Sequence, residues 1–551
     1  MLPIAPTPLN WVILAEAVHL FCHLYEPRTA HGGLALVLLT PAFFFLVGDT
    51  ATSIPLVFTS YCYFIGSLCA SIVLYRLSPL HPLYHIPGPR LWRVSKLLGI
   101  FMQWTGHQHL YMKRAHDKYG PVIRTGPNEV SVADVDAVGS VYGSGGLPKG
   151  QCMIRLQRLQ TCVFKFYLQS MRLEKIPELL PILLAMQGEA HANRRRLWNR
   201  GMSTESLKEY EEVIAKRATQ LLDCIADMGT IDFSAWISYF AFDFMGDMAF
   251  GGGFELLANE ADRTKIWPII EKFNITISIF THVPWAAQTL LLFPVATRDK
   301  LRKFGVENAL RRSKSTAKTK DLWYHLMDEA GMEKQKPPLG DVVADGALAV
   351  IAGADTTASA LSSLIFLLLS HPKYYKQLQE EIDMYFPPGA DPLDPSSHAD
   401  MKFLNACLNE TLRIQPPVRT NGPRQIPTGS QGKIIAGVFI PEGTQVYVPP
   451  YSLHLDSRYF SPSPDRFMPE RWIDPALAPN ATAFIPFSYG PSNCVGRNLA
   501  KQEMAMVTCL LLSRLEFRFA PGFDVAGWPS QLHDHFVTTQ GPLMVSVKRR
   551  Q

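Results

Sequence analysis

The sequence predicts a mainly α-helical protein with small β-sheets, preceded by an N-terminal membrane anchor. From about residue 90 to the end, long stretches repeat their apolar residues with helical periodicity. In Lys433–Val448, strand-forming residues are interrupted by Gly437 and by Pro441–Gly443, which is typical of a β-hairpin. Near the N-terminus, Ile54–Tyr75 is 22 residues long and carries no charge, which is enough for a helix to cross a bilayer.

The anchor is expected to cover residues 1–80, with one to three spans and Ile54–Tyr75 as the best of them. Two shorter apolar runs, Leu34–Val47 and Leu9–Tyr25, are candidates for the others. Basic residues follow the best span, which favours the cytoplasmic side for what comes next; they are Arg76, Arg90, Arg93 and Lys96. A cleaved signal peptide is disfavoured because no Lys or Arg occurs before Arg28.

Residues 81–90 contain alternating Pro and Gly and are expected to form a stiff, non-helical linker. Residues 91–551 are then expected to form one large globular domain, in which five stretches favour helices. The most apolar of them, Val342–Ser370, contains Asp345 and Asp355 and is therefore interpreted as a buried core helix and not as a membrane span. The other four are Ser203–Asp227, Pro372–Tyr385, Asp400–Ile414 and Arg497–Leu515.

Composition excludes several classes of protein. Only 18% of the 551 residues are charged and 47% are hydrophobic, so the chain is not intrinsically disordered. Nine Cys residues are too few for a disulfide-stapled scaffold. The net charge is +5 without a dense Lys/Arg run, so nucleic acid is not expected as a partner.

A single Cys lies in a loop rich in Gly, Pro, Ser and Asn, directly before the predicted helix Arg497–Leu515. The free N–H groups at a helix N-terminus stabilise a thiolate, so Cys494 is a candidate metal ligand. Gly490 can adopt a positive φ, Gly496 lets a flat object approach the backbone, and Phe487 can pack against the sulfur. A thiolate of this kind can serve as an axial haem ligand.

The pattern Phe487-x-x-Gly490-x-x-x-Cys494-x-Gly496 resembles the haem-binding signature of the cytochromes P450. The resemblance extends over about residues 85–550 and implies a cytochrome P450-like helical fold with haem b as cofactor and Cys494 as the axial ligand of its iron. Many members of the family carry Arg or His two residues before this Cys, where the present chain has Ser492.

The predicted core helix contains Asp355 and Thr356, within the run Ala352–Thr357. An acid beside a hydroxyl in an apolar helix is costly unless it is hydrogen-bonded or used. The run resembles the oxygen-activation segment of the family. By that resemblance Thr356 hydrogen-bonds dioxygen and Asp355 supplies protons, while Gly353 makes room for a small ligand.

Two further motifs complete the resemblance. Glu410 and Arg413 are spaced to pair on one helix face and, with Arg471 from a later loop, resemble the structural Glu-x-x-Arg element that lies under the haem. His191 and Arg195 also share a helix face and, with Arg424, resemble the partners of the haem propionates. A basic surface helix is the alternative for His191 and Arg195. The stretch Gly150–Gln187 fits neither motif and is either a lid over the substrate or an artefact of the gene model.

The resemblance implies a monooxygenase that uses O2 and electrons from a membrane-bound NADPH–cytochrome P450 reductase to hydroxylate a lipophilic small molecule. Only 57 residues follow Cys494, too few for a flavin domain of its own. The residues within the motifs resemble those of fungal microsomal members of the family. This resemblance implies that the chain lies in the endoplasmic reticulum membrane with its catalytic domain in the cytoplasm. It also implies a substrate from secondary metabolism. A haem-thiolate isomerase or dehydratase that needs no O2 and a non-catalytic haem-binding protein are the alternatives.

Overall fold

The computed structural model describes most of the chain, and the architecture below refers to these residues. They are 7–25, 30–47, 53–150, 183, 186–252, 254–258, 307–314 and 320–550, with single positions at 272, 275, 276, 278, 279 and 282. Most of the stretch Gly150–Gln187, whose role the sequence leaves open, lies outside them.

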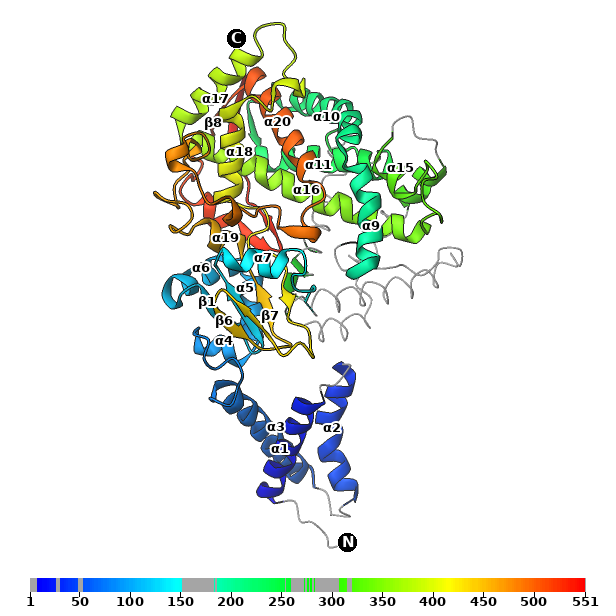
Figure 1. The fold of residues 1–551 in the computed structure, drawn as a ribbon, viewed down its shortest axis with the longest axis vertical. Helices are drawn as coiled ribbons and strands as arrows, with labels where there is room; N and C mark the ends of the chain where they lie inside the picture. The colour runs from blue at the N-terminus through cyan, green and yellow to red at the C-terminus, as the bar shows by residue number, and fades with distance from the viewer. Residues whose placement is uncertain are drawn as a thin grey trace.

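Three N-terminal helices stand apart from the body of the molecule (Figure 1). They are α1 (Pro8–Leu24), α2 (Ala30–Val47) and α3 (Ile54–Leu77), and α1 packs along α3. The helix α3 begins where the predicted span begins and ends at Leu77 instead of Tyr75. It is long and apolar enough to cross a membrane. Within the described residues one other helix passes the same test, α16 (Leu339–Ser370), but 72% of its apolar window is buried, as expected for a core helix.

The predicted linker has the expected non-helical form, and it is docked on the body. Leu83 and Ile86 are each 1% exposed and join the core around the first sheet. The Pro87 carbonyl accepts a hydrogen bond of 2.7 Å from the Arg124 backbone N–H. A Cβ at Gly88, whose φ is +151°, would lie 2.5 Å from the Arg124 carbonyl, so only glycine permits this approach.

The strands form small sheets. The largest has the order β1 (Val122–Gly126), β2 (Glu129–Val132), β7 (Gln445–Tyr447) and β4 (Arg424–Gln425); β2 and β7 are parallel, and the other neighbours are antiparallel. The predicted hairpin is confirmed as β5 (Lys433–Ile435) and β6 (Val438–Ile440), whereas β7 leaves it for the largest sheet. The remaining strands pair as β3–β11–β8 (Thr230–Asp232, Met544–Arg549, Leu515–Phe519) and β9–β10 (His533–His535, Val537–Thr539).

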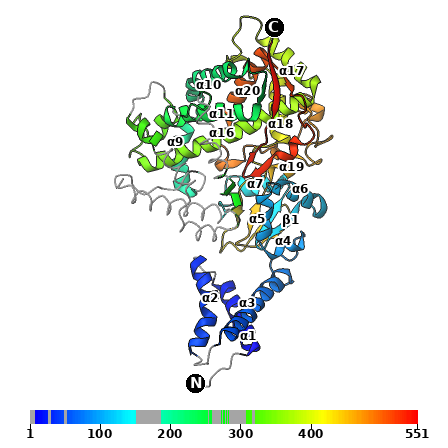
Figure 2. The ribbon, with the colours of Figure 1, turned by 180° about the vertical axis from the view of Figure 1, so that it is seen from behind.

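Helices build most of the body, and α16 crosses its middle in both views (Figure 1, Figure 2). Its apolar surface packs against α11 (Phe233–Phe250) and contributes to one large hydrophobic core. The other α-helices are α4 (Arg90–Val94), α5 (Leu97–Trp104), α6 (Gln108–Tyr119), α7 (Asp136–Tyr142), α9 (Gly188–Gly201), α10 (Thr204–Ile225), α15 (Leu322–Leu326), α17 (Pro372–Tyr385), α18 (Lys402–Ile414), α19 (Pro450–His454) and α20 (Arg497–Arg514). Short 3-10 helices are η2 (Pro395–Ser397), η3 (Pro469–Trp472), η4 (Pro475–Leu477), η5 (Ala481–Ala483), η6 (Gly490–Ser492) and η7 (Trp528–Gln531).

Local sequence signals explain where the helices begin and end. The Ser203 hydroxyl accepts a hydrogen bond from the Ser206 N–H and caps α10, as its position in the sequence suggests. The next helix after α16 starts at Pro372, a residue that suits a first helical turn. Gly353 on α16 lines the cavity described below, and a Cβ there would lie 2.7 Å from the Met245 sulfur, so this glycine also permits the close packing of α11 on α16.

Candidate active site

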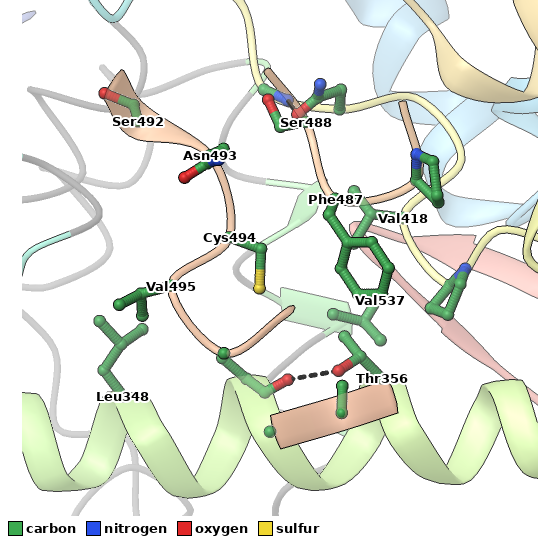
Figure 3. A pocket seen from close by; sticks show the side chains of 18 of the residues that line it. Leu348, Thr356, Val418, Phe487, Ser488, Ser492, Asn493, Cys494, Val495 and Val537 are labelled. Atoms are coloured by element: carbon green, nitrogen blue, oxygen red, sulfur yellow. Dashed lines mark hydrogen bonds between the residues drawn. The ribbon is translucent and has the colours of Figure 1, made fainter. Parts of the chain in front are cut away.

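A cavity of about 340 Å³ lies between α16 and the loop that precedes α20 (Figure 3). Further walls come from α9, from the end of the largest sheet and from the turn between β9 and β10, and most of the lining is apolar. Nine of the residues that the sequence singles out line it: His191, Arg195, Gly353, Thr356, Arg424, Phe487, Ser492, Cys494 and Gly496. The lining does not include Asp355, Gly490, Glu410, Arg413 or Arg471.

The loop around Cys494 is folded back on itself and directs the sulfur into the cavity, toward α16 (Figure 3). The Cys494 N–H donates to the Phe487 carbonyl at 2.9 Å, and the Asn493 N–H donates to the Gly490 carbonyl at 3.0 Å. Although protein surrounds it, the Cys494 side chain is accessible because it faces the cavity. Burial raises the pKa of the Cys494 thiol, while the Gly496 N–H and two nearby guanidinium groups, those of Arg195 and Arg497, act in the opposite direction.

The two glycines of the loop have different roles. Gly490 has a φ of +70°, and a Cβ there would lie 2.0 Å from the Tyr142 carbonyl at the end of α7. Only glycine therefore allows the loop to pack on α7. A Cβ at Gly496 would meet no described atom within 4 Å, because this residue borders the cavity. Its backbone is open to a flat group that lies against the loop.

Below the loop, Glu410, Arg413 and Arg471 form the predicted triad, and each is at most 1% exposed. The Glu410 carboxylate accepts two hydrogen bonds from Arg413, at 2.7 and 2.8 Å, and lies 3.6 Å from Arg471 Nε. The guanidinium of Arg471 also donates to backbone carbonyls, among them that of Ser461 at 2.9 Å. The charges are thus paired within the protein, which is the arrangement that a buried ion cluster needs to be stable.

His454, which the sequence analysis missed, connects this triad to the Cys494 loop. Its Nδ1 hydrogen-bonds the Arg413 carbonyl at 3.1 Å, and its Nε2 accepts from the Ile485 N–H at 3.0 Å. The Ile485 carbonyl in turn accepts a hydrogen bond from the N–H of Ser488, which belongs to the Cys494 loop. Burial lowers the pKa of His454 to about 3, so the ring is neutral and can serve as donor on one side and acceptor on the other. A histidine in an apolar stretch gives no sequence signal for this role.

On the side of the cavity near α9, four basic side chains gather: Lys149, His191, Arg195 and Arg424. The sequence analysis missed Lys149, which pairs with Arg424 in an isolated β-bridge. Burial, Arg424 and Arg195 together lower the pKa of Lys149 to about 7. Burial and the three neighbouring cations likewise lower the pKa of His191 to about 4. Glu503 is the one acidic residue in the described lining, and it does not feature among the influences on these pKa values.

These features fit the haem group that the signature implies. Lys149, Arg195 and Arg424, with the neutral His191 beside them, can donate hydrogen bonds to the two propionates, and the open backbone at Gly496 suits the flat macrocycle. Arg195 is already oriented by the loop, since it donates to the Asn493 carbonyl at 2.7 Å and to Asn493 Oδ1 at 2.8 Å. The lining therefore offers a thiol, a flat surface and a cationic edge in one cavity.

Across the cavity from Cys494, Thr356 lies on α16 (Figure 3). Its hydroxyl donates to the Ala352 carbonyl one turn earlier, at 2.7 Å. Asp355 is half-buried and does not belong to the lining. Of the predicted acid–hydroxyl pair, the structure thus places only the hydroxyl at the cavity.

Comparison with known proteins agrees with the motifs. A model of the cytochrome P450 family matches residues 160–547. The cytochrome P450 monooxygenase cpaH of Aspergillus oryzae is 32% identical, with 90% of this chain and 93% of the relative aligned. Tryprostatin B 6-hydroxylase of Aspergillus fumigatus is 30% identical over 89% and 84%, and cytochrome P450 67 of Uromyces fabae is 29% identical over 96% of both. The chain therefore belongs to the cytochrome P450 family, and it is a haem-thiolate monooxygenase that takes electrons from a redox partner and acts on a lipophilic small molecule.

Proposed function

We propose that Cys494 is the axial ligand of the haem iron, with Phe487, Gly490 and Gly496 shaping its loop. The observation that carries this assignment is the direction of the Cys494 sulfur, which points into the cavity opposite Thr356. The other free Cys residues that the structure describes, among them the buried Cys407 and Cys509, do not line the cavity. The triad of Glu410, Arg413 and Arg471 supports the loop from below through His454 and has no chemical role.

The cations at the edge of the cavity have a binding role in this proposal. Lys149, Arg195 and Arg424, together with His191, hold the propionate groups, and the arriving anions offset the repulsion of Lys149 by the two guanidinium groups. When bound, haem supplies the redox chemistry by which dioxygen is activated, and the thiolate ligand favours O–O cleavage. In this proposal the Thr356 hydroxyl turns away from the Ala352 carbonyl to donate its hydrogen bond to dioxygen, and Asp355 supplies protons from outside the lining.

Replacement of the sulfur tests the assignment. The Cys494→Ala variant should lose the absorption band that a thiolate-ligated, reduced haem gives with carbon monoxide. Cys509→Ala is the matched control because it removes a buried thiol from α20 at a distance from the cavity. If Cys494→Ala keeps the band, or if Cys509→Ala alone removes it, the ligand has been assigned to the wrong residue.

For the redox partner, the proposal names a membrane-bound NADPH–cytochrome P450 reductase. Arg497 and Lys501 support this choice, since both are exposed on the first turns of α20, next to the Cys494 loop. Reversing both charges, in Arg497→Glu/Lys501→Glu, should slow reductase-dependent reduction by roughly 10-fold at low salt, because steering by surface charge acts on the association rate. Reduction by dithionite should stay unchanged, and equal slowing of both would point to damage at the haem instead.

For the location, the proposal is the endoplasmic reticulum membrane, with residues 1–80 as anchor, 81–90 as linker and 91–551 as catalytic domain on the cytoplasmic side. The apolar α3 and the basic residues Arg76, Arg90, Arg93 and Lys96 after it support this orientation. In sealed microsomes, protease added from outside should digest the domain beyond residue 90. A domain that is protected until detergent is added would reverse the orientation.

For the substrate, the proposal is a lipophilic compound of fungal secondary metabolism that the enzyme hydroxylates. The apolar lining and the hydroxylase and monooxygenase names of the fungal relatives support it. The test is turnover of a panel of lipophilic compounds by microsomes that contain the chain and a reductase. Hydroxylated product that requires both NADPH and O2 is expected; product formed without O2 would favour the isomerase or dehydratase alternative.

A further inference from the structure

Glu503 on α20, nine residues after Cys494, is the acidic member of the described cavity lining. Its side chain is 2% exposed and lies where α20 packs on α16. A hydrogen bond joins its carboxyl group to the Thr357 hydroxyl. Its Oε1 atom has no hydrogen-bond partner among the described residues. A buried carboxyl group with one free oxygen at a cavity is costly, so it calls for a role.

The surroundings of Glu503 keep it in the neutral acid form. Burial raises its pKa well above the ordinary range, and the Thr357 hydroxyl offsets this only in part. The four basic side chains of the lining are not among the causes of this shift. A neutral acid can donate a proton as well as accept a hydrogen bond, which a carboxylate cannot do.

Thr357 connects Glu503 to the proposed oxygen side of the cavity. It follows Thr356 directly, and successive residues of an α-helix point about 100° apart. Thr356 therefore faces Cys494 while Thr357 reaches Glu503, and both residues line the same cavity. Two adjacent hydroxyls on α16 thus point to two different groups: that of Thr356 to Cys494 in the loop, and that of Thr357 to Glu503 on α20.

We propose that Glu503 is a positioning residue for proton delivery, which holds an ordered water molecule on Oε1 in the cavity wall and fixes Thr357 with its other oxygen. Ordered water commonly satisfies a buried polar atom that has no partner within the protein. The inference rests on the proposed function of Cys494 and Thr356. It adds an acid within the lining, whereas Asp355 lies outside it.

The protons and electrons of one turnover balance. Monooxygenation consumes O2, two electrons from the redox partner and two protons, and it yields hydroxylated product and water. In each transfer the Glu503 O–H bond breaks as its proton passes to the water on Oε1, and that water releases one of its own protons toward the oxygen side of the cavity. An O–H bond then forms again on the same carboxyl group with a proton that comes from solvent. Glu503 therefore ends each cycle as the neutral acid, and no electron passes through it.

A spectroscopic test reads the carboxyl group itself and needs no turnover. In the haem-loaded protein, the infrared stretching band of a buried protonated carboxyl should disappear in Glu503→Gln. The same band should shift in Thr357→Val, because one of its hydrogen bonds is lost. A spectrum that is identical in wild type and Glu503→Gln would show that Glu503 is ionised and would overturn the proposal.

A second test reads the fate of electrons in reductase-supported turnover. Glu503→Gln, an uncharged isostere, should form about 10-fold less product per NADPH consumed and release hydrogen peroxide instead, below the 10²–10⁴-fold effect of an acid that acts directly. The matched control is Glu211→Gln, since the Glu211 carboxylate bonds the neighbouring Gln502 at 3.0 Å but does not line the cavity. Unchanged coupling in Glu503→Gln, or an equal loss in Glu211→Gln, would contradict the role.

The carbon monoxide band of the reduced protein separates this proposal from the one on which it rests. Glu503→Gln should keep the thiolate band, because its side chain does not support the Cys494 loop. Loss of coupling with the band intact supports Glu503 alone. Absence of the band from the wild-type protein would instead remove the assignment of Cys494, whatever Glu503→Gln does to coupling.

Discussion

Two buried clusters of charged side chains lie near the Cys494 loop, and they differ in how their charges are balanced. In the triad of Glu410, Arg413 and Arg471, the charges are paired at 2.7–3.6 Å and the spare donors reach backbone carbonyls. In the cluster that contains Lys149 and Arg424, burial lowers the pKa values of both groups, and the guanidinium groups of Arg424 and Arg195 lower that of Lys149 further. The triad is complete without a ligand, whereas the cationic cluster is not.

The difference separates a folding element from a binding element. A buried ion cluster whose charges are all paired stabilises one arrangement of the chain, and removal of one partner leaves the others as uncompensated buried charges. An unbalanced cluster destabilises the ligand-free protein and returns that free energy when an anion binds. The same residue types therefore predict opposite outcomes when they are mutated.

The largest effect is expected in the triad. Glu410→Ala leaves two buried guanidinium groups without their carboxylate and should lower the free energy of unfolding by about 3–5 kcal/mol. The measurement is urea unfolding, together with the yield of protein that shows the thiolate carbon monoxide band. If Glu410→Ala unfolds at the same urea concentration as wild type, the triad is not a folding element.

A smaller loss should follow where the triad meets the Cys494 loop. His454→Phe keeps a ring of similar shape but leaves the Ile485 N–H and the Arg413 carbonyl without their partner. Buried groups without partners cost about 1–3 kcal/mol each, and we expect the lower half of the summed range, roughly 2–4 kcal/mol, because the Phe ring still fills the space of the imidazole. The thiolate band should also convert more readily to the form without thiolate on warming. If His454→Phe changes neither the free energy of unfolding nor the resistance of the thiolate band to warming, the loop is held independently of the triad.

Mutation in the cationic cluster should move stability and haem binding in opposite directions. Lys149→Met removes one repelling charge, so the haem-free chain should become more stable. It also removes one partner of a propionate, so haem affinity should fall by about 10-fold, or roughly 1.4 kcal/mol. Urea unfolding without haem and haem transfer to apomyoglobin measure the two quantities. A change of the same sign in both would place Lys149 with the structural residues.

How far the sequence predicts this site depends on whether a residue belongs to a spaced pattern. Glu410 and Arg413 are three residues apart on one helix, and Cys494 stands at a fixed distance from Phe487 and Gly496, so local spacing alone indicates them. Long helices are predicted for a similar reason, because apolar periodicity and capping residues are local signals. The predicted Asp400–Ile414 helix, for example, is observed as Lys402–Ile414.

Lys149 and His454 could not be predicted, since each is a single residue without a periodic neighbour. Their roles come from tertiary contacts: Lys149 reaches the cavity through its bridge to Arg424, which is 275 positions away, and His454 reaches Ile485 across a loop. The packing role of Gly353 was missed for the same reason, because Met245, which occupies the space of a Cβ at that position, is on another helix.

A pH dependence, small per pH unit, is expected from the unbalanced cluster and not from the triad. In the folded haem-free chain the pKa of Lys149 is about 7, whereas in the unfolded chain it returns to 10.5. Between these values the unfolded chain binds more protons, so the free energy of unfolding should rise with pH, by at most about 1.4 kcal/mol per pH unit. Below pH 7 both states are protonated and the Lys149 contribution is constant. Urea unfolding at pH 7 and pH 9 measures the slope, and Lys149→Met should flatten it. Bound haem should flatten it too, because its propionates restore the charged lysine. An equal slope in wild type and Lys149→Met would mean that the cations are already compensated, and the contrast between the two clusters would then disappear.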